Sequence, residues 1–472
     1  MTVSSRRFDP TWRSITERRP SRRDFLRLVT AGAVGVAAGS PLLACSPGGG
    51  GSGAGLSLQE GELKYLSEDT SDIEVAWYRR VTEAFEAQYT RVNGEHLGTG
   101  EDFYQKLQTL FAARTPPDLI PRTSQARALT LWTEGVLQPV GDIVDRIGRD
   151  KFTQAGLDAF IDNGDVYGIP SQGTSTVFWY RTDLAEQAGL SGPTTWEELL
   201  AFAKALTVDT DGDGRIDQWG TSVPFGRNSM TNQWFFCLLR QNGGNIVDPD
   251  LNVVFDSPKT VEALEFMREL VQYSPPGGGN FSFAEMVSNF VTGKSASTYY
   301  MGRIVQTVED TAPDLSGKFE ATMFPRAAGA DPFWYGALSA AVVPADVERR
   351  DLAEAWLVDF QFKSFYLDWL NLLPGHNLPL MKGFDTLPEY TNYPARAKYP
   401  AIMETLQRSL EEGNDFVKES PDHKLNPMGG ELASGFILAD MIQSVLIQNE
   451  DSASAVKRAA GQISEVMERG MR

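Results

Sequence analysis

Short apolar runs alternate with amphipathic stretches along most of the chain. The first apolar run is Leu63–Leu66. It is followed by a stretch whose large side chains recur at helical spacing and share one face: Trp77, Val81, Ala84, Phe85 and Tyr89. A strand followed by an amphipathic helix is the repeating unit of an α/β lobe, so this order predicts such a lobe.

Capping signals and apolar spacing predict further helices. Thr195 is followed three residues later by Glu198, which is the pattern of a capping box and predicts a helix over residues 196–206. In the last third of the chain, apolar residues at three-to-four spacing predict more helices, over 351–370, over 429–448 and through 456–467.

The N-terminal segment has the composition of an export signal. Arg22 and Arg23 form a basic start, residues 28–44 are weakly apolar, and Ala44 is a small residue placed before Cys45. The segment resembles a twin-arginine signal that ends in a lipobox. This resemblance implies cleavage before Cys45, attachment of lipid to that cysteine, and a location outside the cytoplasm at the cell membrane.

We therefore expect residues 1–44 to be a signal peptide and residues 45–57 to be a flexible tether. The Gly- and Ser-rich composition behind the cysteine behaves as coil and cannot bury a core. A transmembrane anchor is the rival interpretation. The apolar stretch is shorter than the roughly 20 residues that a span needs, and Gly and Pro dilute it.

Length, charge and cysteine content narrow the class of protein. The chain that remains is long for a single core and favours two lobes. A net charge of −19 argues against general attraction to nucleic acid or to an anionic membrane surface. Cys237 lies in an apolar run, where an inert buried thiol is expected. The fold then has no disulfide and depends on its core, which 42% hydrophobic residues permit.

The sequence gives little support for catalysis. It contains no G-x-S-x-G, H-E-x-x-H, P-loop or G-x-G-x-x-G motif. It has three histidines, none with a partner at metal-ligand spacing. We expect a protein that is not an enzyme and that requires no cofactor.

One acidic loop has the opening of a calcium site. Its residues place carboxylates at positions 1, 3, 5 and 9 and a glycine at position 6, and the candidate metal residues are Asp209, Asp211, Asp213, Arg215 and Asp217. Gly220 occupies position 12, where a complete loop has a bidentate Glu. Structural Ca²⁺ and a plain solvated turn therefore both stay open.

Four segments together resemble one family, the extracellular solute-binding proteins of ABC importers, family 1, which includes maltose- and glycerol-phosphate-binding proteins. The most specific segment runs from Val166-Tyr167-Gly168-Ile169-Pro170 through Phe178-Trp179-Tyr180-Arg181-Thr182-Asp183-Leu184 to Pro193-Thr194-Thr195-Trp196-Glu197-Glu198-Leu199. The other three are 115–140, 290–303 and 334–339. Two departures concern the ligand: Gly302-Arg303 stands where the family often has an aromatic residue, and Arg181 replaces a usual Asn.

The resemblance implies a two-lobe periplasmic-binding-protein fold of type II. This is an α/β fold in which hinges link two lobes of mixed sheets flanked by helices. We expect residues 58–168 plus 299–337 in the N-terminal lobe and residues 169–298 plus 338–472 in the C-terminal lobe. A solute would enter the cleft of the open form and be buried by closure.

A sugar site needs flat aromatic rings and fixed polar groups, and this chain supplies both near predicted strand ends. The candidate ligand-binding residues are Glu68, Asp69, Arg122, Ser124, Gln125, Gln172, Thr174, Trp234, Tyr300, Arg303, Trp334 and Tyr335. Trp234 and Trp334 could equally serve as core. Arg303 could grip a carboxylate or phosphate, or form a salt bridge across the hinge.

The resemblance implies a monomeric lipoprotein that captures a di- or oligosaccharide and delivers it to the transmembrane subunits of an ABC permease. An anionic solute such as a glycerophosphodiester is the alternative within the family. A secreted glycan hydrolase would also need aromatics and paired acids. A sensory protein that signals without transport is a third alternative.

Overall fold

The computed structural model describes residues 61–97 and 101–470. The predicted signal peptide, tether and lipidated Cys45 lie outside these residues. The described residues belong to one compact unit, Leu58–Arg472, and that unit is described by itself. Among the described residues, no helix combines the length and the apolar character needed to cross a membrane.

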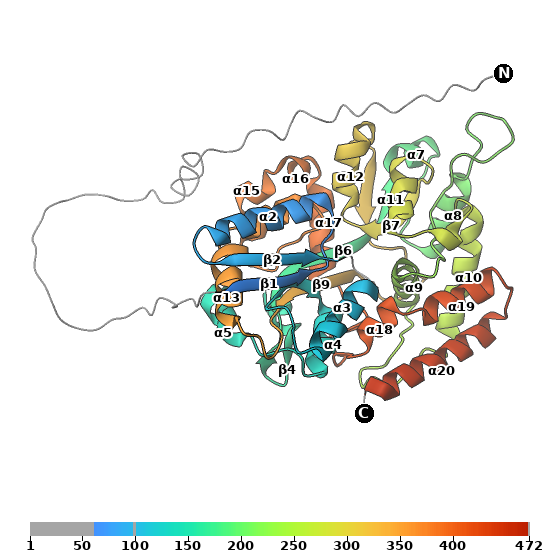
Figure 1. The fold of residues 1–472 in the computed structure, drawn as a ribbon. Coiled ribbons are helices and arrows are strands. Elements are labelled where there is room, and N and C mark those ends of the chain that lie inside the picture. The colour runs from blue at the N-terminus through green and yellow to red at the C-terminus, as the bar shows by residue number, and fades with distance from the viewer. Residues whose placement is uncertain (1–60, 98–100, 471–472) are drawn as a thin grey trace, which may run out of the picture. The chain divides into compact units, whose positions relative to one another are not determined.

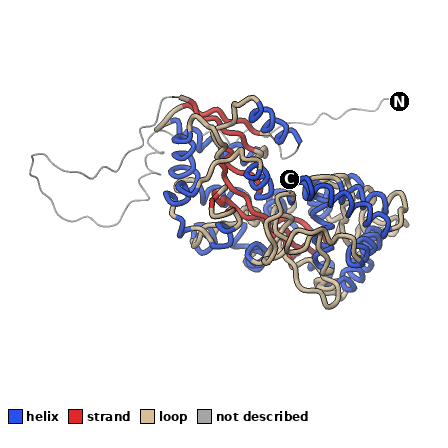
Figure 2. Tube along the Cα trace, turned by 90° about the horizontal axis from the view of Figure 1, so that it is seen from below, coloured by secondary structure: helices blue, strands red, loops and turns tan. Residues whose placement is uncertain are grey.

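Two long strands form the centre of the molecule. Strand β6 (Ile169–Arg181) pairs along its first half with β9 (Tyr335–Val342) and along its second half with β7 (Ser297–Met301) and β8 (Phe319–Thr322), always antiparallel. Strand β3 (Ile120–Ser124) joins the outer edge of β9. Figure 2 shows these strands running from one group of helices to the other.

The first group of elements, the first lobe, buries two adjoining hydrophobic clusters. A short parallel pair, β1 (Glu62–Ser67) and β2 (Arg91–His96), lies beside β3. The helices and small strands of this lobe are α2 (Asp72–Glu86), α3 (Glu101–Ala112), α4 (Gln125–Thr133), α5 (Gly141–Ile147), α6 (Gln154–Asp158), β4 (Ile161–Asp162), β5 (Asp165–Val166), α13 (Arg350–Ala355), a π-helix (Trp356–Phe362), α14 (Tyr366–Leu372) and α15 (Pro388–Thr391).

The second group, the second lobe, is built around one large hydrophobic cluster that includes the second half of β6. Helix α9 crosses the middle of this lobe in Figure 1. Its helices are α7 (Thr182–Gln187), α8 (Trp196–Ala205), α9 (Ser229–Gln241), α10 (Pro258–Leu270), α11 (Phe283–Val291), α12 (Ile304–Thr311), α16 (Pro394–Lys398), α17 (Pro400–Glu411), α18 (Gly429–Ser434), α19 (Ile437–Leu446) and α20 (Ser452–Gly470).

Two segments pack in the lobe opposite to the predicted one. Residues 299–337 were expected in the N-terminal lobe, yet Ile304, Val305 and Phe319 pack in the cluster of the second lobe. Residues 350–372 were expected in the C-terminal lobe, yet they pack against β1 and α2. The reason is that β7 stays beside the second half of β6, so the chain first returns to the first lobe through β9.

Local capping chemistry explains where α8 begins. The Thr195 hydroxyl accepts a hydrogen bond from the Glu198 amide at 3.2 Å, and the Glu198 carboxylate accepts from the Thr195 amide at 3.1 Å. The predicted capping box is therefore confirmed. The predicted helix over 351–370 is instead α13, a π-helix and α14, and the one over 429–448 is divided at Gly435 into α18 and α19.

Cys237 is a free, fully buried thiol, as predicted. Burial raises the pKa of this thiol well above its usual range. Its sulfur lies 2.8 Å from the Tyr299 hydroxyl, inside the core of the second lobe. A buried thiol that stays protonated is poorly suited to nucleophilic chemistry.

Candidate functional site

The chain leaves β1 through a buried carboxylate that is fully engaged. Asp69 accepts hydrogen bonds from Arg122 Nε at 3.1 Å and from the Tyr78 hydroxyl at 2.9 Å, and its second oxygen also contacts the Arg122 guanidinium. The side chain of Asp69 has no exposed surface, and that of Arg122 is 17% exposed. Burial lowers the pKa of Arg122, while Glu68 raises it. Two predicted site residues thus form one buried ion pair.

A second ion pair lies beside the first. The Glu68 carboxylate contacts the guanidinium of Arg127, which comes from the first turns of α4. The Arg127 guanidinium also lies 5.2 Å from the centre of the Phe103 ring. The start of α4 places Arg127 in the first turn of the helix. Ser124 is the N-cap residue, and its hydroxyl accepts a hydrogen bond from the Arg127 amide at 3.3 Å.

The strand that crosses between the lobes contributes Gln172 and Thr174. The carbonyl oxygen of the Gln172 side chain accepts from Trp369 Nε1, so its amide NH₂ is the group left to donate. Trp369 lies 5.9 Å from the Arg122 guanidinium. The Thr174 hydroxyl lies 3.4 Å from the His376 carbonyl oxygen.

His376 completes this edge of the crossing strands. The side chain is half-buried, and its Nδ1 atom is buried without a hydrogen-bond partner among the described residues. Burial lowers the pKa of His376 well below 6.5, and the charges of Arg303 and Arg122 lower it further. The imidazole is therefore neutral at pH 7.

Arg303 approaches the same region from the second lobe. It lies between β7 and α12, and its guanidinium is 3.7 Å from the carboxylate of Glu74 in α2 of the first lobe. The side chain of Arg303 is 35% exposed and that of Glu74 is 8% exposed. Nearby, burial raises the pKa of Tyr300 to about 12, while Arg303 lowers it. Of the two roles predicted for Arg303, the salt bridge between the lobes is the one observed.

Together these side chains form what we call the polar cluster. Its members are Glu68, Asp69, Glu74, Arg122, Arg127, Gln172, Thr174, Arg303, Trp369 and His376. Each of its three arginines faces one of its three acids, so the cluster carries no net charge when His376 is neutral. Such a cluster can offer many hydrogen bonds to a ligand without strongly attracting either sign of charge.

Other predicted site residues lie in the core of the second lobe. Trp234 is 1% exposed and packs edge-on against Phe324, with ring centroids 5.4 Å apart. Tyr335 is 9% exposed and packs against Phe236. The indole of Trp334 is buried, and the Arg408 guanidinium lies 5.4 Å from its centre. These aromatic residues pack as core, so the predicted contact between their rings and a solute finds no support in this packing.

Gln125 and Ser124 have local structural roles. The side-chain amide of Gln125 donates to the Ala159 carbonyl oxygen at 2.8 Å, and Ser124 caps α4. Conversely, sequence reasoning missed Glu74, Arg127 and Trp369. Glu74 forms a capping box with Ser71, so its sequence pattern indicates only a helix start. Trp369 meets Gln172 from 197 positions away in the chain, which no local pattern reveals.

The acidic loop brings three of its carboxylates together. Oxygens of Asp209, Asp211 and Asp217 lie within 4.8 Å of one another. Asp209 accepts hydrogen bonds from the Gly214 and Gly212 amides at 2.7 and 2.6 Å, and these bonds hold its pKa below the usual range. Backbone amides already satisfy this carboxylate, as in a solvated turn. Binding of Ca²⁺ by the loop stays a prediction.

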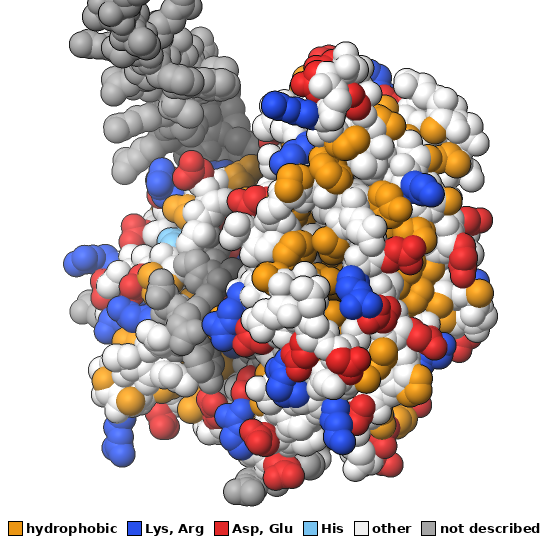
Figure 3. All heavy atoms as spheres, turned by 90° about the vertical axis from the view of Figure 1, so that its right-hand side faces the viewer, with side chains coloured by type: hydrophobic (Ala, Val, Ile, Leu, Met, Phe, Trp, Pro, Cys, Tyr) orange, Lys and Arg blue, Asp and Glu red, His pale blue; other side chains and the backbone are white. Residues whose placement is uncertain are grey.

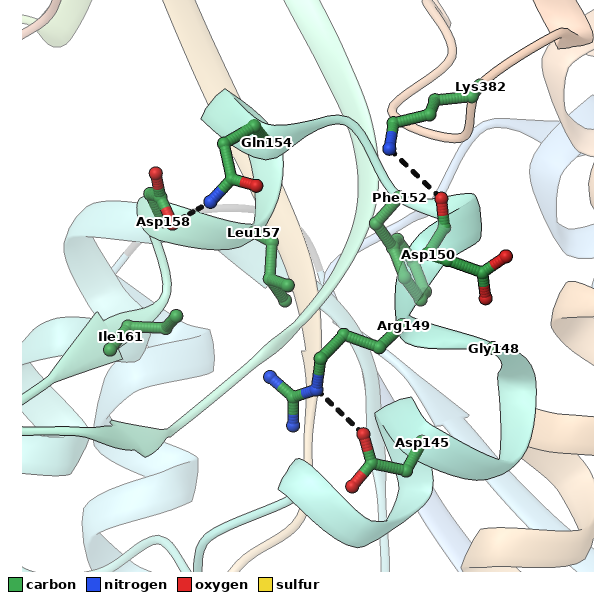
Figure 4. A pocket seen from close by; sticks show the side chains of 10 residues that line it. All are labelled: Asp145, Gly148, Arg149, Asp150, Phe152, Gln154, Leu157, Asp158, Ile161 and Lys382. Atoms are coloured by element: carbon green, nitrogen blue, oxygen red, sulfur yellow. Dashed lines mark hydrogen bonds and ion pairs between the residues drawn. The ribbon is translucent and has the colours of Figure 1, made fainter.

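A surface recess lies elsewhere, on the first lobe between α5 and α6 (Figure 4). Apolar Phe152, Leu157 and Ile161 form part of its lining. Its two cations are engaged with an acid or with backbone: Arg149 Nε lies 2.7 Å from Asp145 Oδ1, and Lys382 donates to the Asp150 carbonyl oxygen at 3.0 Å. The recess shares no residue with the polar cluster.

Charges on the surface are mixed in sign. Figure 3 views the molecule from the side of α10, α19 and α20 and shows acidic and basic side chains interspersed, with hydrophobic side chains between them. A broad basic surface, which nucleic-acid binding requires, is not seen on this face.

A family model described as bacterial extracellular solute-binding protein matches residues 69–367. The arabinooligosaccharide-binding protein of Bacillus subtilis is 26% identical over 233 residues, which cover 46% of this chain and 50% of that protein. The matched family segment includes most of the polar cluster and both crossing strands.

Two solved structures illustrate the shared fold. An ABC transporter solute-binding protein from Agrobacterium radiobacter K84, in complex with ribitol, superposes with a TM-score of 0.72 at 22% identity and covers 86% of this chain and 98% of that one. UgpB from Mycobacterium tuberculosis, in complex with glycerophosphocholine, gives a TM-score of 0.69 at 18% identity and covers 87% and 100% of the two chains. At these identities the likeness shows the two-lobe fold.

Proposed function

The chain belongs to the bacterial extracellular solute-binding proteins, and on that premise we propose that it captures a neutral carbohydrate at the polar cluster between its lobes. A di- or oligosaccharide is the form we favour. Proteins of this family bind small molecules outside the cytoplasm and work with ABC permeases. The proposed role is therefore delivery of the captured sugar to a permease in the membrane.

The charge balance of the polar cluster carries this proposal. Arg122 is neutralised by Asp69 and Arg127 by Glu68, so neither offers free positive charge to an anion. A sugar hydroxyl can both donate and accept, and ionised side chains strengthen such bonds. The Gln172 amide adds a donor whose orientation Trp369 fixes. An arabinooligosaccharide binder among the relatives and a ribitol complex among the similar structures agree with a polyhydroxylated ligand.

A glycerophosphodiester is the second candidate, and Arg303 is the observation that favours it. This arginine is the most exposed of the three in the cluster, and its partner Glu74 is 3.7 Å away, beyond hydrogen-bonding distance. A phosphate group could draw Arg303 away from Glu74 and bind its guanidinium bidentately. The glycerophosphocholine complex of a similar structure supports the same class.

The two crossing strands support a closing motion. Strands β6 and β9 each begin in one lobe and end in the other, and they are paired side by side. A pair of strands of this kind allows the lobes to rotate about the crossing, which is the hinge closure seen in periplasmic binding proteins. Closure would bring Arg303 of the second lobe over a solute held by the first.

We favour binding over hydrolysis. A glycosidase needs one carboxylic acid that can donate a proton and a second carboxylate across the substrate. The acids of the polar cluster, Glu68, Asp69 and Glu74, each face an arginine, which stabilises the ionised form. An arrangement of this kind suits hydrogen bonding to a ligand better than proton donation.

For the cellular context we propose a monomer that is tethered to the membrane by lipid on Cys45, after removal of residues 1–44. The lipobox resemblance supports this anchor. Metabolic labelling with an alkyne fatty acid would mark the wild-type chain, and Cys45→Ala would abolish the label. Labelling that persists in Cys45→Ala would contradict the anchor. Permease genes beside the coding sequence would favour import over a purely sensory role.

A thermal-shift screen tests the proposed ligand class. Neutral mono-, di- and oligosaccharides, sugar alcohols and glycerophosphodiesters are added separately to the purified chain. A ligand at 100 times its dissociation constant stabilises by roughly 2.7 kcal/mol. We expect stabilisation by neutral sugars. Stabilisation by phosphodiesters alone would overturn the neutral class, and release of sugar product from an oligosaccharide would overturn the binding role.

A further inference from the structure

The segment between α17 and α18, residues 413–428, is packed into both lobes. Phe416 is 2% exposed and stacks on Phe236 of α9, with ring centroids 4.1 Å apart. The next residue, Val417, is fully buried in the first-lobe cluster that contains Leu129 and Ala340. Two consecutive side chains are therefore anchored in the cores of different lobes.

Polar contacts attach this segment to the second lobe. The Glu419 carboxylate is 2% exposed and accepts hydrogen bonds from the Ile246 and Val247 amides, each at 3.0 Å. The Arg240 guanidinium donates to the Ser420 hydroxyl at 2.9 Å. At the surface, Lys424 lies 2.7 Å from Asp250. The attachment is thus a buried carboxylate with outer contacts around it.

The attachment to the first lobe is mainly apolar. Besides Val417, Leu425 packs against the same cluster. The Thr130 hydroxyl of α4 lies 3.4 Å from the Pro427 carbonyl oxygen. Just beyond the segment, α18 lies beside α4 (Figure 1), close enough that a Cβ on Gly430 would lie 3.2 Å from the Cβ of Ala126.

Hydrogen bonds within the segment keep its two anchors together. Asp415 Oδ1 accepts from the Val417 amide at 2.8 Å, and the Asn426 amide donates to the Val417 carbonyl oxygen at 2.7 Å. These bonds close the segment into a compact loop. A movement of one anchor is therefore passed to the other.

Val417 of the segment and the part of the polar cluster formed by Gln172 and Trp369 lie on opposite faces of β9. Side chains alternate between the two faces of a strand. Ala340 of β9 packs in the same hydrophobic cluster as Val417. The preceding residue, Ser339, therefore faces the other side, and Gln172 is paired with it across the strands. On that side Gln172 contacts Trp369, which belongs to the other hydrophobic cluster of the first lobe. When two lobes rotate about crossing strands so that one side closes, the opposite side opens. Closure over the polar cluster would therefore stretch the contacts of residues 413–428.

We propose that residues 413–428 form an interlobe strap that favours the open arrangement of the lobes and so sets the fraction of closed protein in the absence of solute. This proposal rests on the proposed function in one respect only: it requires that the two lobes move relative to each other. A weaker strap raises the closed fraction. Because the closed form is the one that holds the solute tightly, a tenfold rise in a small closed fraction gives about tenfold tighter apparent binding.

The distance between the lobes tests this directly and needs no solute. Spin labels are placed on Arg79→Cys in α2 and Lys204→Cys in α8, both exposed, in a Cys45→Ser background, and their separation is measured by pulsed electron paramagnetic resonance. Val417→Ala removes part of the first-lobe anchor. We expect it to shift the distance distribution towards shorter, closed values.

Val342→Ala is the matched control. Val342 is also fully buried in the cluster of Val417, but it lies on β9 and does not belong to the strap. We expect its distance distribution to match that of the wild type. Equal distributions for wild type, Val417→Ala and Val342→Ala would overturn the strap, and so would equal shifts in both variants.

Glu419→Gln tests the second anchor and covers the case in which Val417→Ala fails to fold. A glutamine keeps one acceptor oxygen but places an NH₂ against the other backbone amide, so one of the two hydrogen bonds is lost. We expect the same shift towards closed distances. An unchanged distribution in Glu419→Gln would overturn the role of this anchor. If no solute binds in any screen, the distance result still stands, so the two proposals can fail separately.

Discussion

The charged site residues predicted in the first lobe form ion pairs at the ends of strands, whereas the aromatic site residues predicted in the second lobe are packed in its core. Asp69, Glu68 and Arg122 are brought together at the ends of β1 and β3, where each finds a partner of opposite charge. Trp234 and Tyr335 are instead absorbed into the core. A buried charge is stable only beside a partner, whereas a large aromatic ring gains most by leaving water. Charged residues after strands are therefore the better guide to a site.

The largest expected effect is on the aromatic side of this comparison. Trp234→Ala should lower the free energy of unfolding by about 3–5 kcal/mol, because it opens a cavity in a closely packed core. Urea unfolding measures the loss. Solute affinity of the folded fraction, measured by calorimetry, should stay unchanged. A specific loss of affinity at unchanged stability would instead return Trp234 to the site.

A loss of similar size is expected on the charged side. Asp69→Asn leaves Arg122 largely buried without its anionic partner and should cost about 3–5 kcal/mol of stability. Urea unfolding gives the value, and Asp69→Asn with Arg122→Met serves as the control. Because the double variant removes both charges, it should recover part of the loss. A single variant as stable as the wild type would show that the pair does not behave as a buried ion pair.

The strap gives the stability a pH dependence. Burial raises the pKa of Glu419 from 4.5 to about 7 and that of Asp415 from 3.8 to about 6. At a pH between the unfolded and the folded pKa of each acid, the folded state therefore binds more protons than the unfolded state. The stabilisation is fully present below the unfolded pKa values and is lost as the pH rises through about 6 and 7.

Urea unfolding at several pH values measures this effect. Arg240 and the backbone amides of Ile246 and Val247 counteract the shift at Glu419. Glu419→Gln should flatten the upper part of the profile, while the part due to Asp415 remains. A wild-type profile that matches the Glu419→Gln profile would contradict a protonated Glu419 in the folded protein.

A smaller effect is expected at the contact between the lobes. Arg303→Ala should change stability by less than about 1 kcal/mol, because the ion pair with Glu74 is long and partly exposed. The substitution should moderately weaken binding of a neutral sugar and should abolish binding of a phosphodiester. Calorimetry with both ligand classes distinguishes these cases, and Arg303→Lys, which keeps the charge, is the control. Unchanged binding of every ligand would remove Arg303 from the site.

The smallest effect concerns the acidic loop. If it binds Ca²⁺ weakly, millimolar calcium compared with a chelator should stabilise the chain by about 1 kcal/mol or less. Asp209→Asn should abolish the difference, and native mass spectrometry should count one ion per chain. An equal melting temperature with calcium and with chelator would leave the loop as a plain turn.

The elements that the sequence predicted well are those set by neighbours in the chain. The helix at Trp196 follows from Thr195 and Glu198, which lie three residues apart. The assignment of segments to lobes depends instead on which strand pairs with each half of β6. These strands, β7 and β9, lie more than a hundred residues away in the chain. The contact of Trp369 with Gln172 has the same origin. Local pattern carries no signal for either.

The most direct test of the central claim is a calorimetric titration of the best neutral sugar from the screen into wild type and Gln172→Ala. Gln172 is buried at the crossing strands, where its side-chain oxygen accepts from Trp369 and its NH₂ group is left to donate. The account predicts one site per chain and at least about tenfold weaker binding in the variant, since a hydrogen bond inside a closed cleft is lost. An unchanged dissociation constant would show that the sugar binds elsewhere.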